Sequence, residues 1–169
     1  MELITIREYE NGGKIQQYQA VDTSAGDYPK VFACCDYFAR QGATAIITPA
    51  FLVGTIGNPE YEEIYSSLKG SPYWGKCPDF CVNGIWYEHE GYNEAKDLSK
   101  PSKRADTFSK MLNRGLKQSD RIIIEDCGVG HSYAHRSIFR RIRFEGQNIR
   151  EIYIRTQTGL ELFYKKEAE

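Results

Sequence analysis

Long apolar runs are missing from this sequence of 169 residues. No window reaches about 18 consecutive apolar residues, the length that a membrane-spanning helix needs. The opening stretch, MELITIREYENGG, has acids where an export signal has basic residues, and it lacks an apolar centre. We therefore expect a cytoplasmic protein that has no membrane partner.

Internal repeats, low-complexity segments and paired cysteine spacings are also absent. The 5 cysteines are odd in number and lack the paired two-residue spacings of a zinc site. Reduced thiols, most of them buried for structural reasons, are the simplest interpretation. With 41% hydrophobic residues, the chain can bury a sizeable core. We expect one domain over residues 1–169.

The net charge of −1 is small, but the balance changes sharply along the chain. Residues 1–99 carry 7 Lys and Arg against 14 Asp and Glu, a balance of −7. Residues 100–143 carry 11 against 4, a balance of +7. A metal-dependent enzyme that acts on a polyanion needs such a combination, because phosphates require cations and metal ions require carboxylates. Solvated helix faces are the alternative explanation of the basic excess.

Hydrophobic periodicity and turn residues predict a mixed α/β (α+β) fold. Strands are expected at 3–9, 14–21, 43–48, 78–90 as a hairpin, 121–126, and in a last hairpin around Thr158-Gly159. Helices are expected at 28–42, 59–68, 103–119 and 132–144, with loops at 51–58 and 91–102. Alternating strands and helices with hairpins at both ends indicate a central mixed sheet flanked by helices.

The segment CPDFCVNGIWYEHE, residues 77–90, contains acids on both sides of a turn. Asn83-Gly84 predicts a type I′ turn, because that turn needs φ > 0 at both central positions. In that register Asp79 faces Glu88, and alternation puts Glu90 on the same side. Facing carboxylates repel each other, and a divalent cation with oxygen ligands would offset the repulsion. A solvent-exposed acidic face is the alternative.

The basic segment contains candidates for contact with nucleic acid. They are Lys110 and Arg114 in the helix expected at 103–119, and Arg136, Arg140 and Arg141 in the helix expected at 132–144. The planar fork of arginine suits phosphate. Nucleic-acid contact and ordinary surface are both open interpretations of these side chains.

The order helix, strand, hairpin with Pro-Asp and then Glu-x-x, helix, strand resembles the PD-(D/E)XK nuclease superfamily. More narrowly, three stretches and the closing hairpin resemble the C-terminal tRNA-nuclease domain of contact-dependent growth inhibition toxins. The stretches are Cys77-Pro78-Asp79-Phe80, Trp86-Tyr87-Glu88-His89-Glu90 and Leu116-Lys117-Gln118. The resemblance covers residues 28–165 and leaves residues 1–27 as an N-terminal hairpin extension.

This resemblance implies a restriction-endonuclease-like fold, in which Asp79 and Glu88 bind Mg²⁺ or Mn²⁺ and Gln118 lies on the helix that flanks the site. The chain would then be an endonuclease that hydrolyses phosphodiester bonds in nucleic acid, with RNA or tRNA favoured over DNA. Its partners would be nucleic acid and a cognate immunity protein. An acid on the first helix often contributes in the superfamily, and Asp36 is a weaker candidate for that role.

Glu90 stands where the family's motif usually has lysine. It would then be a third metal ligand or the general base. Alternatively, Lys117 or Lys110 would supply the missing cation from the following helix, and the sequence leaves both possibilities open. Two other functions remain open. One is a non-catalytic nucleic-acid-binding module of the same fold. The other is a metal-independent ribonuclease that uses His131 or His135, four residues apart, as its acid or base.

Overall fold

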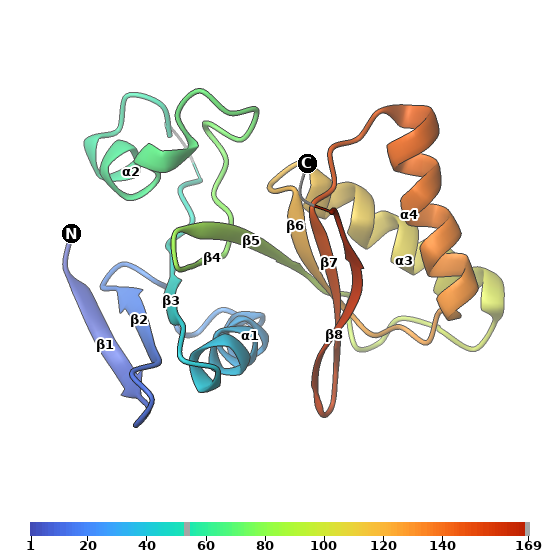
Figure 1. The fold of residues 1–169 in the computed structure, drawn as a ribbon, viewed down its shortest axis with the longest axis horizontal. Helices are drawn as coiled ribbons and strands as arrows, with labels where there is room; N and C mark the ends of the chain where they lie inside the picture. The colour runs from blue at the N-terminus through green and yellow to red at the C-terminus, as the bar shows by residue number, and fades with distance from the viewer. Residues whose placement is uncertain (53–54, 168–169) are drawn as a thin grey trace. The chain divides into compact units, whose positions relative to one another are not determined.

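The computed structural model describes residues 1–52 and 55–167, and the chain divides into two compact units, Met1–Glu88 and His89–Glu169 (Figure 1). Each unit combines a sheet with helices, which confirms the predicted mixed α/β class. The predicted loop at 51–58 includes residues 53 and 54, which lie outside the described residues. The single domain, and its division into an N-terminal extension and a nuclease-like core, stay predictions.

The first unit contains a mixed sheet. Its elements are β1 (Leu3–Glu8), β2 (Lys14–Tyr18), α1 (Tyr28–Arg40), β3 (Thr44–Ile47), α2 (Pro59–Ile64), the short 3-10 helix η1 (Ser66–Leu68), β4 (Phe80–Val82) and the start of β5 (Ile85–Glu90). Strand β2 pairs antiparallel with β1 and parallel with β3, and helix α1 is the crossover. Strands β3, β4 and β5 pair antiparallel in turn. The N-terminal hairpin is thus part of this sheet.

The turn between β1 and β2 lies directly against the end of α1. A Cβ atom at Gly13 would lie 1.7 Å from the carbonyl oxygen of Ala39, so only glycine fits there. Asp36 of α1 forms an ion pair with Arg7 at 3.2 Å and accepts a hydrogen bond from Tyr9. These contacts hold the hairpin on the helix, and they engage the carboxylate that was a weaker metal-ligand candidate.

Strands β4 and β5 are covered on both faces. On one face, Phe38 of α1 packs on Phe80 and Tyr87, with ring centroids 6.3 and 5.2 Å apart. On the other, Trp86 stacks on Tyr65 at 4.9 Å, next to the cluster formed by α2 and η1. A hairpin that is apolar on both sides needs such double coverage.

The second unit contains α3 (Pro101–Leu116), β6 (Arg121–Glu125), α4 (His131–Glu145), β7 (Glu151–Thr156) and β8 (Gly159–Lys165). Strands β6 and β7 are parallel and connected by α4, and β8 returns antiparallel to β7. Helix α3 begins two residues earlier than predicted, because proline is favoured in the first turn of a helix. None of the helices in the described ranges combines the length and apolar character that crossing a membrane requires.

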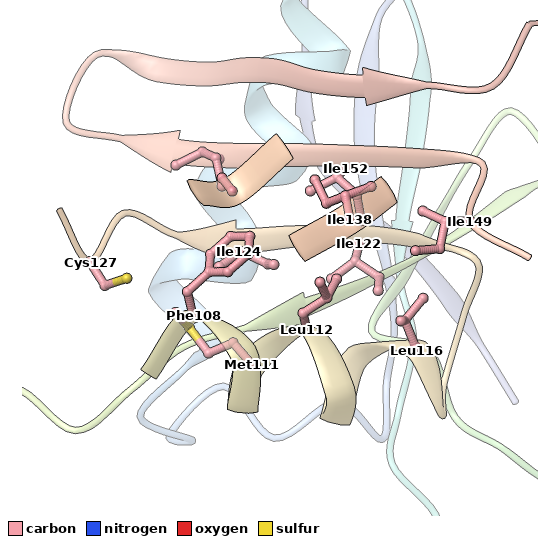
Figure 2. Close-up of a cluster of buried hydrophobic side chains, with 12 residues drawn as sticks. Phe108, Met111, Leu112, Leu116, Ile122, Ile124, Cys127, Ile138, Ile149 and Ile152 are labelled. Carbon is pink, nitrogen blue, oxygen red and sulfur yellow. The ribbon is translucent and has the colours of Figure 1, made fainter. Parts of the chain in front are cut away.

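Helices α3 and α4 cover the same face of this second sheet. Figure 2 shows the buried cluster between them, to which Ile122 and Ile124 of β6 and Ile152 of β7 contribute. Helix α3 adds Phe108, Met111, Leu112 and Leu116, and helix α4 adds Ala134 and Ile138. Since strand side chains alternate between faces, residues 121, 123 and 125 project to the opposite face.

Candidate functional site

The turn of the acidic hairpin has the predicted geometry. Asn83 and Gly84 have φ of 48° and 83°, the left-handed conformation that a type I′ turn requires at both positions. The register pairs Phe80–Val82 with Ile85–Tyr87, as predicted. The Asn83 side chain accepts a hydrogen bond of 2.9 Å from the backbone N–H of Thr44, which fixes the turn to β3.

Asp79 and Glu88 are the chain neighbours of the last register pair, Phe80 with Tyr87. Asp79 lies just before β4, and its carbonyl oxygen accepts a hydrogen bond of 3.1 Å from the N–H of Thr48. Glu88 lies in β5 and is 8% exposed. Because side chains alternate along a strand, the carboxyl group of Glu88 belongs to the face that carries Trp86. That the carboxyl group of Asp79 lies on the same face stays a prediction.

Glu90 lies beside an arginine of α3. The Nε of Arg114 donates to Oε2 of Glu90 at 3.0 Å, and its Nη2 donates to the carbonyl oxygen of Gly91 at 2.9 Å. The helix approaches closely because it has a glycine here: a Cβ atom at Gly115 would lie 3.2 Å from Cγ of Glu90 and 2.8 Å from Cγ2 of Ile122. The position of the family's lysine is thus occupied by an acid that holds a guanidinium group.

The two lysines expected to replace the missing cation have other surroundings. Lys110 forms an ion pair of 3.0 Å with Asp106 one turn earlier, and both side chains are exposed. Lys117 follows the last residue of α3 and is exposed. Gln118 is half-buried after the helix, and its N–H donates to the carbonyl oxygen of Gly115 at 2.9 Å. The cation next to Glu90 therefore comes from Arg114.

Asp79 and Glu88 provide the oxygen ligands that Mg²⁺ prefers. Such ions are commonly bound by one or two carboxylates, with waters and phosphate oxygens as the remaining ligands. Among residues 1–52 and 55–167, no three His, Cys, Asp or Glu side chains gather in a group that could hold a metal ion. The metal site stays a prediction, and so does the ligand role of Glu90, whose carboxylate bonds Arg114.

The three candidate arginines of α4 differ in exposure. Arg136 and Arg140 are exposed, whereas Arg141 is 8% exposed. The Nε and Nη2 of Arg141 donate to Oδ1 of Asn113 at 3.1 and 3.0 Å, and its Nη1 donates to the carbonyl and hydroxyl oxygens of Ser137. Burial lowers the pKa of Arg141. Of the two open interpretations of Arg141, ordinary surface is wrong, because the residue is buried and bonds α4 to α3. Its contact with nucleic acid stays a prediction.

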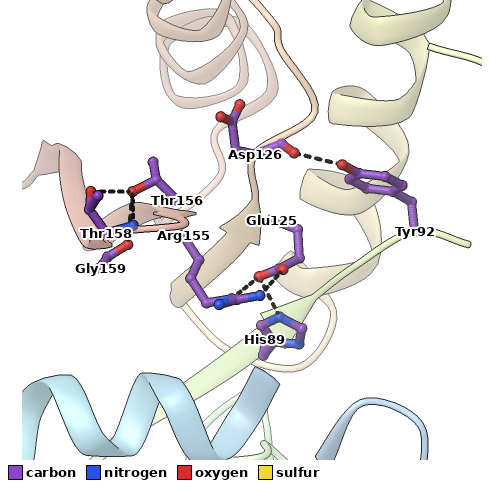
Figure 3. A network of polar contacts seen from close by, with 8 residues as sticks. All are labelled: His89, Tyr92, Glu125, Asp126, Arg155, Thr156, Thr158 and Gly159. Carbon is purple, nitrogen blue, oxygen red and sulfur yellow. Dashed lines mark hydrogen bonds and ion pairs between the residues drawn. The ribbon is translucent and has the colours of Figure 1, made fainter. Parts of the chain in front are cut away.

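A buried polar network in the second unit was missed by sequence reasoning (Figure 3). The Nε2 of His89, a residue 5% exposed, lies 3.0 Å from Oε2 of Glu125. Arg155 donates from Nε and Nη2 to the two carboxylate oxygens of Glu125, at 2.5 Å each. Burial by itself would raise the pKa of Glu125, but the hydrogen bonds from His89 and Arg155 outweigh it and lower that pKa to about 2. Glu125 is therefore ionised at neutral pH.

His131 and His135 pack against an aromatic ring of the last hairpin. Their ring centroids lie 4.6 and 5.6 Å from that of Phe163 in β8. The Nε2 of His131 is 4.0 Å from Oε1 of Glu161, and both of these side chains are exposed. These contacts describe a packed pair of histidines, and their acid or base role stays a prediction.

No protein-family model, curated protein or solved structure matches this chain. The nuclease resemblance therefore rests on the sequence motifs alone.

Proposed function

We propose that the chain is a metal-dependent endonuclease that hydrolyses phosphodiester bonds in nucleic acid. The observation that carries this proposal is the ion pair of 3.0 Å between Glu90 and Arg114. It supplies a cation at the hairpin position where the resembled nucleases have a lysine. The preference for RNA, and for tRNA in particular, rests on the resemblance to the toxin domain, as does a cognate immunity protein as second partner.

The roles of the residues follow from their chemistry. Asp79 and Glu88 would hold Mg²⁺ or Mn²⁺ through their carboxylate oxygens. When bound, the ion would supply a water of lowered pKa and neutralise charge on the phosphate. Glu90 would orient Arg114, whose planar guanidinium can donate two parallel hydrogen bonds to phosphate oxygens. Arg114 is 52% exposed, so solvent and ligands can reach it.

A cleavage assay tests the proposal. Labelled tRNA, single-stranded RNA and duplex DNA are incubated with Mg²⁺ or with EDTA. Cleavage of RNA is expected only with Mg²⁺, and Asp79→Asn or Glu88→Gln should abolish it. Arg114→Gln should reduce the rate by about 10²-fold, the usual loss when a donor to developing charge is removed. Lys103→Gln, an exposed change at the other end of α3, is the matched control and should keep full activity.

Other outcomes would identify the rival functions. Cleavage that persists in EDTA and in both acid variants, but disappears in His131→Ala or His135→Ala, would indicate a metal-independent ribonuclease. Binding without cleavage in every condition would indicate a non-catalytic module.

The binding module is the second candidate, because α4 exposes aromatic rings among arginines. Phe139 and Phe144 are 54% and 80% exposed, and exposed Arg140 is the sequence neighbour of Phe139. Exposed aromatic rings stack on bases, and guanidinium groups pair with the backbone phosphates. This surface would serve substrate binding in an endonuclease as well.

A further inference from the structure

Side chains of helices α3 and α4 in the second unit line a groove of about 380 Å³. The two helices are labelled in Figure 1 and contact each other. The lining of the groove includes Ser109 of α3 and Tyr133, Arg136, Arg140, Arg141 and Glu145 of α4. Three guanidinium groups therefore face one carboxylate. The groove carries a net positive charge.

These arginines differ from others in the same unit. Arg114, Arg121, Arg150 and Arg155 each have a carboxylate oxygen at 2.5 to 3.1 Å. Within the described parts of the chain, no carboxylate lies within 4.0 Å of the guanidinium groups of Arg136, Arg140 or Arg141. Glu145 acts on Arg141 only from beyond ion-pair distance. The positive charge of the groove is thus not neutralised by the described residues.

Arg141 is the fixed part of this groove. Asn113 and Ser137 accept four hydrogen bonds from it. A guanidinium group has about five N–H donors, so within the described residues one N–H on Nη2 remains for a ligand. The three acceptor atoms, Oδ1 of Asn113 and the carbonyl and hydroxyl oxygens of Ser137, are neutral, and a buried cation without an anion is costly. An anion in the groove would offset that cost.

The remaining donors of the groove come from both helices. Arg136 and Arg140 are exposed and one helical turn apart, so both can reach into the same groove. The hydroxyl groups of Ser109 in α3 and Tyr133 in α4 lie 3.2 Å apart and share one hydrogen bond, which leaves one O–H as a further donor. Guanidinium forks combined with hydroxyl groups are well suited to the tetrahedral oxygens of a phosphate.

We propose that this groove binds a phosphate group of a nucleic-acid backbone. Arg141 is its fixed donor, and Arg136 and Arg140 close over the phosphate from the rim. Arg143, an exposed arginine of the same helix, does not line the groove and is not part of the site. The identity of the polymer rests on the proposed function, whereas the phosphate chemistry of the groove does not.

Fluorescence anisotropy with a labelled ten-nucleotide RNA in EDTA tests the site, because EDTA separates binding from metal-dependent cleavage. Arg136→Gln and Arg140→Gln should each weaken binding about ten-fold and lower the slope of log K against log salt by about one. Arg143→Gln removes the same charge from the same helix and should weaken binding by less than about two-fold. Equal losses in Arg140→Gln and Arg143→Gln would overturn the site, and so would an absence of binding.

Inorganic phosphate provides a second measurement that needs no Arg141 variant. In wild-type protein, titration with phosphate should change the chemical shift of the Arg141 Nε–H until the change saturates. In Arg140→Gln, saturation should require a higher phosphate concentration. An unmoved signal would overturn the proposal. Phosphate could change this signal while Arg136→Gln and Arg140→Gln leave RNA binding unchanged. That result would overturn the proposal that the groove binds the phosphate of a nucleic acid.

The experiments distinguish a failure of the nuclease proposal from a failure of the phosphate-groove proposal. Loss of RNA binding in Arg140→Gln without cleavage of any substrate by wild type keeps the groove and rejects the nuclease. Normal binding and cleavage in Arg140→Gln keeps the nuclease and rejects the groove.

Discussion

Glu125 and Arg155 lie directly opposite each other on the parallel strands β6 and β7, and two N–O contacts of 2.5 Å join their side chains. At the other end of the pairing, Arg121 faces Glu151 with a contact of 2.6 Å. Strand β6 therefore supplies the cation at this end and the anion at the other end, and β7 supplies the opposite charges. A slip of one residue would separate both pairs and turn the apolar residues to the wrong face. The two ion pairs therefore specify the register of this sheet.

Glu125→Gln should lower the free energy of unfolding by about 3 kcal/mol, because it removes the charge of a buried carboxylate that accepts hydrogen bonds from the half-buried guanidinium of Arg155. Urea denaturation at pH 7 measures this change. Glu161→Gln, at a side chain that is 53% exposed, should change the same quantity by less than about 0.5 kcal/mol. Similar effects of the two variants would contradict the structural role of Glu125.

The same pair predicts how stability depends on pH. The pKa of Glu125 is about 2 in the folded protein, against 4.5 for an unperturbed glutamate. Its contribution to stability should be fully present above about pH 5 and should decrease as the pH falls toward 2, since the unfolded chain takes up the proton first. The difference in unfolding free energy between wild type and Glu125→Gln should narrow over that range. A difference that is constant from pH 5 to pH 2 would disprove the assignment.

Gly13→Ala should destabilise the first unit by about 3 kcal/mol, because the added Cβ would meet the carbonyl oxygen of Ala39 at 1.7 Å. Gly26→Ala is the matched control, since a Cβ there would have no neighbour within 4 Å. It should be neutral or slightly stabilising, because alanine restricts the unfolded chain. Thermal unfolding of the two variants provides the comparison, and equal melting temperatures would count against close contact of hairpin and helix.

Moving the cation tests the role of the Glu90–Arg114 pair. Arg114→Gln alone should reduce cleavage by about 10²-fold. The double variant Glu90→Lys/Arg114→Gln puts an ammonium group at the hairpin position itself and should recover at least about ten-fold of that loss. A double variant as inactive as Arg114→Gln would show that a cation at this position is not sufficient, and single-turnover rates on the cleaved RNA decide the matter.

The hairpin could be predicted because its determinants are local. Asn83-Gly84 requires one turn type, and the turn fixes the register for the neighbouring residues. The helices and strands were predicted for the same reason, with differences of a few residues at their ends. What the sequence could not show is which α3 residue meets Glu90, because this depends on the close approach of the helix at Gly115.

The burial of Arg141 was not predicted, although a signal for it existed. It follows Ala134 and Ile138 at positions i+7 and i+3, which is the buried stripe of α4. A cluster of arginines suggested a common surface, but adjacent residues of a helix point about 100° apart. Assigning each arginine to a face of the helix by its position would have placed Arg141 on the buried face and Arg140 on the exposed face.

The network of His89, Glu125 and Arg155 had a weaker signal. Alternation puts His89 on the same side of its strand as buried Tyr87, which suggests a histidine with an internal partner. Glu125 is 36 residues away and Arg155 another 30, so the partnership depends on strand pairing that no local pattern encodes.

The reversed order of charges along β6 and β7 also bears on the kinetics of folding. Parallel strands can pair only after the crossover through α4 has closed, and this closure has an entropic cost before any strand contact forms. During that search, slipped alignments of β6 and β7 bring isoleucines opposite charged residues and are not stabilised. Misaligned intermediates should therefore dissociate quickly, which keeps the search for the native alignment short.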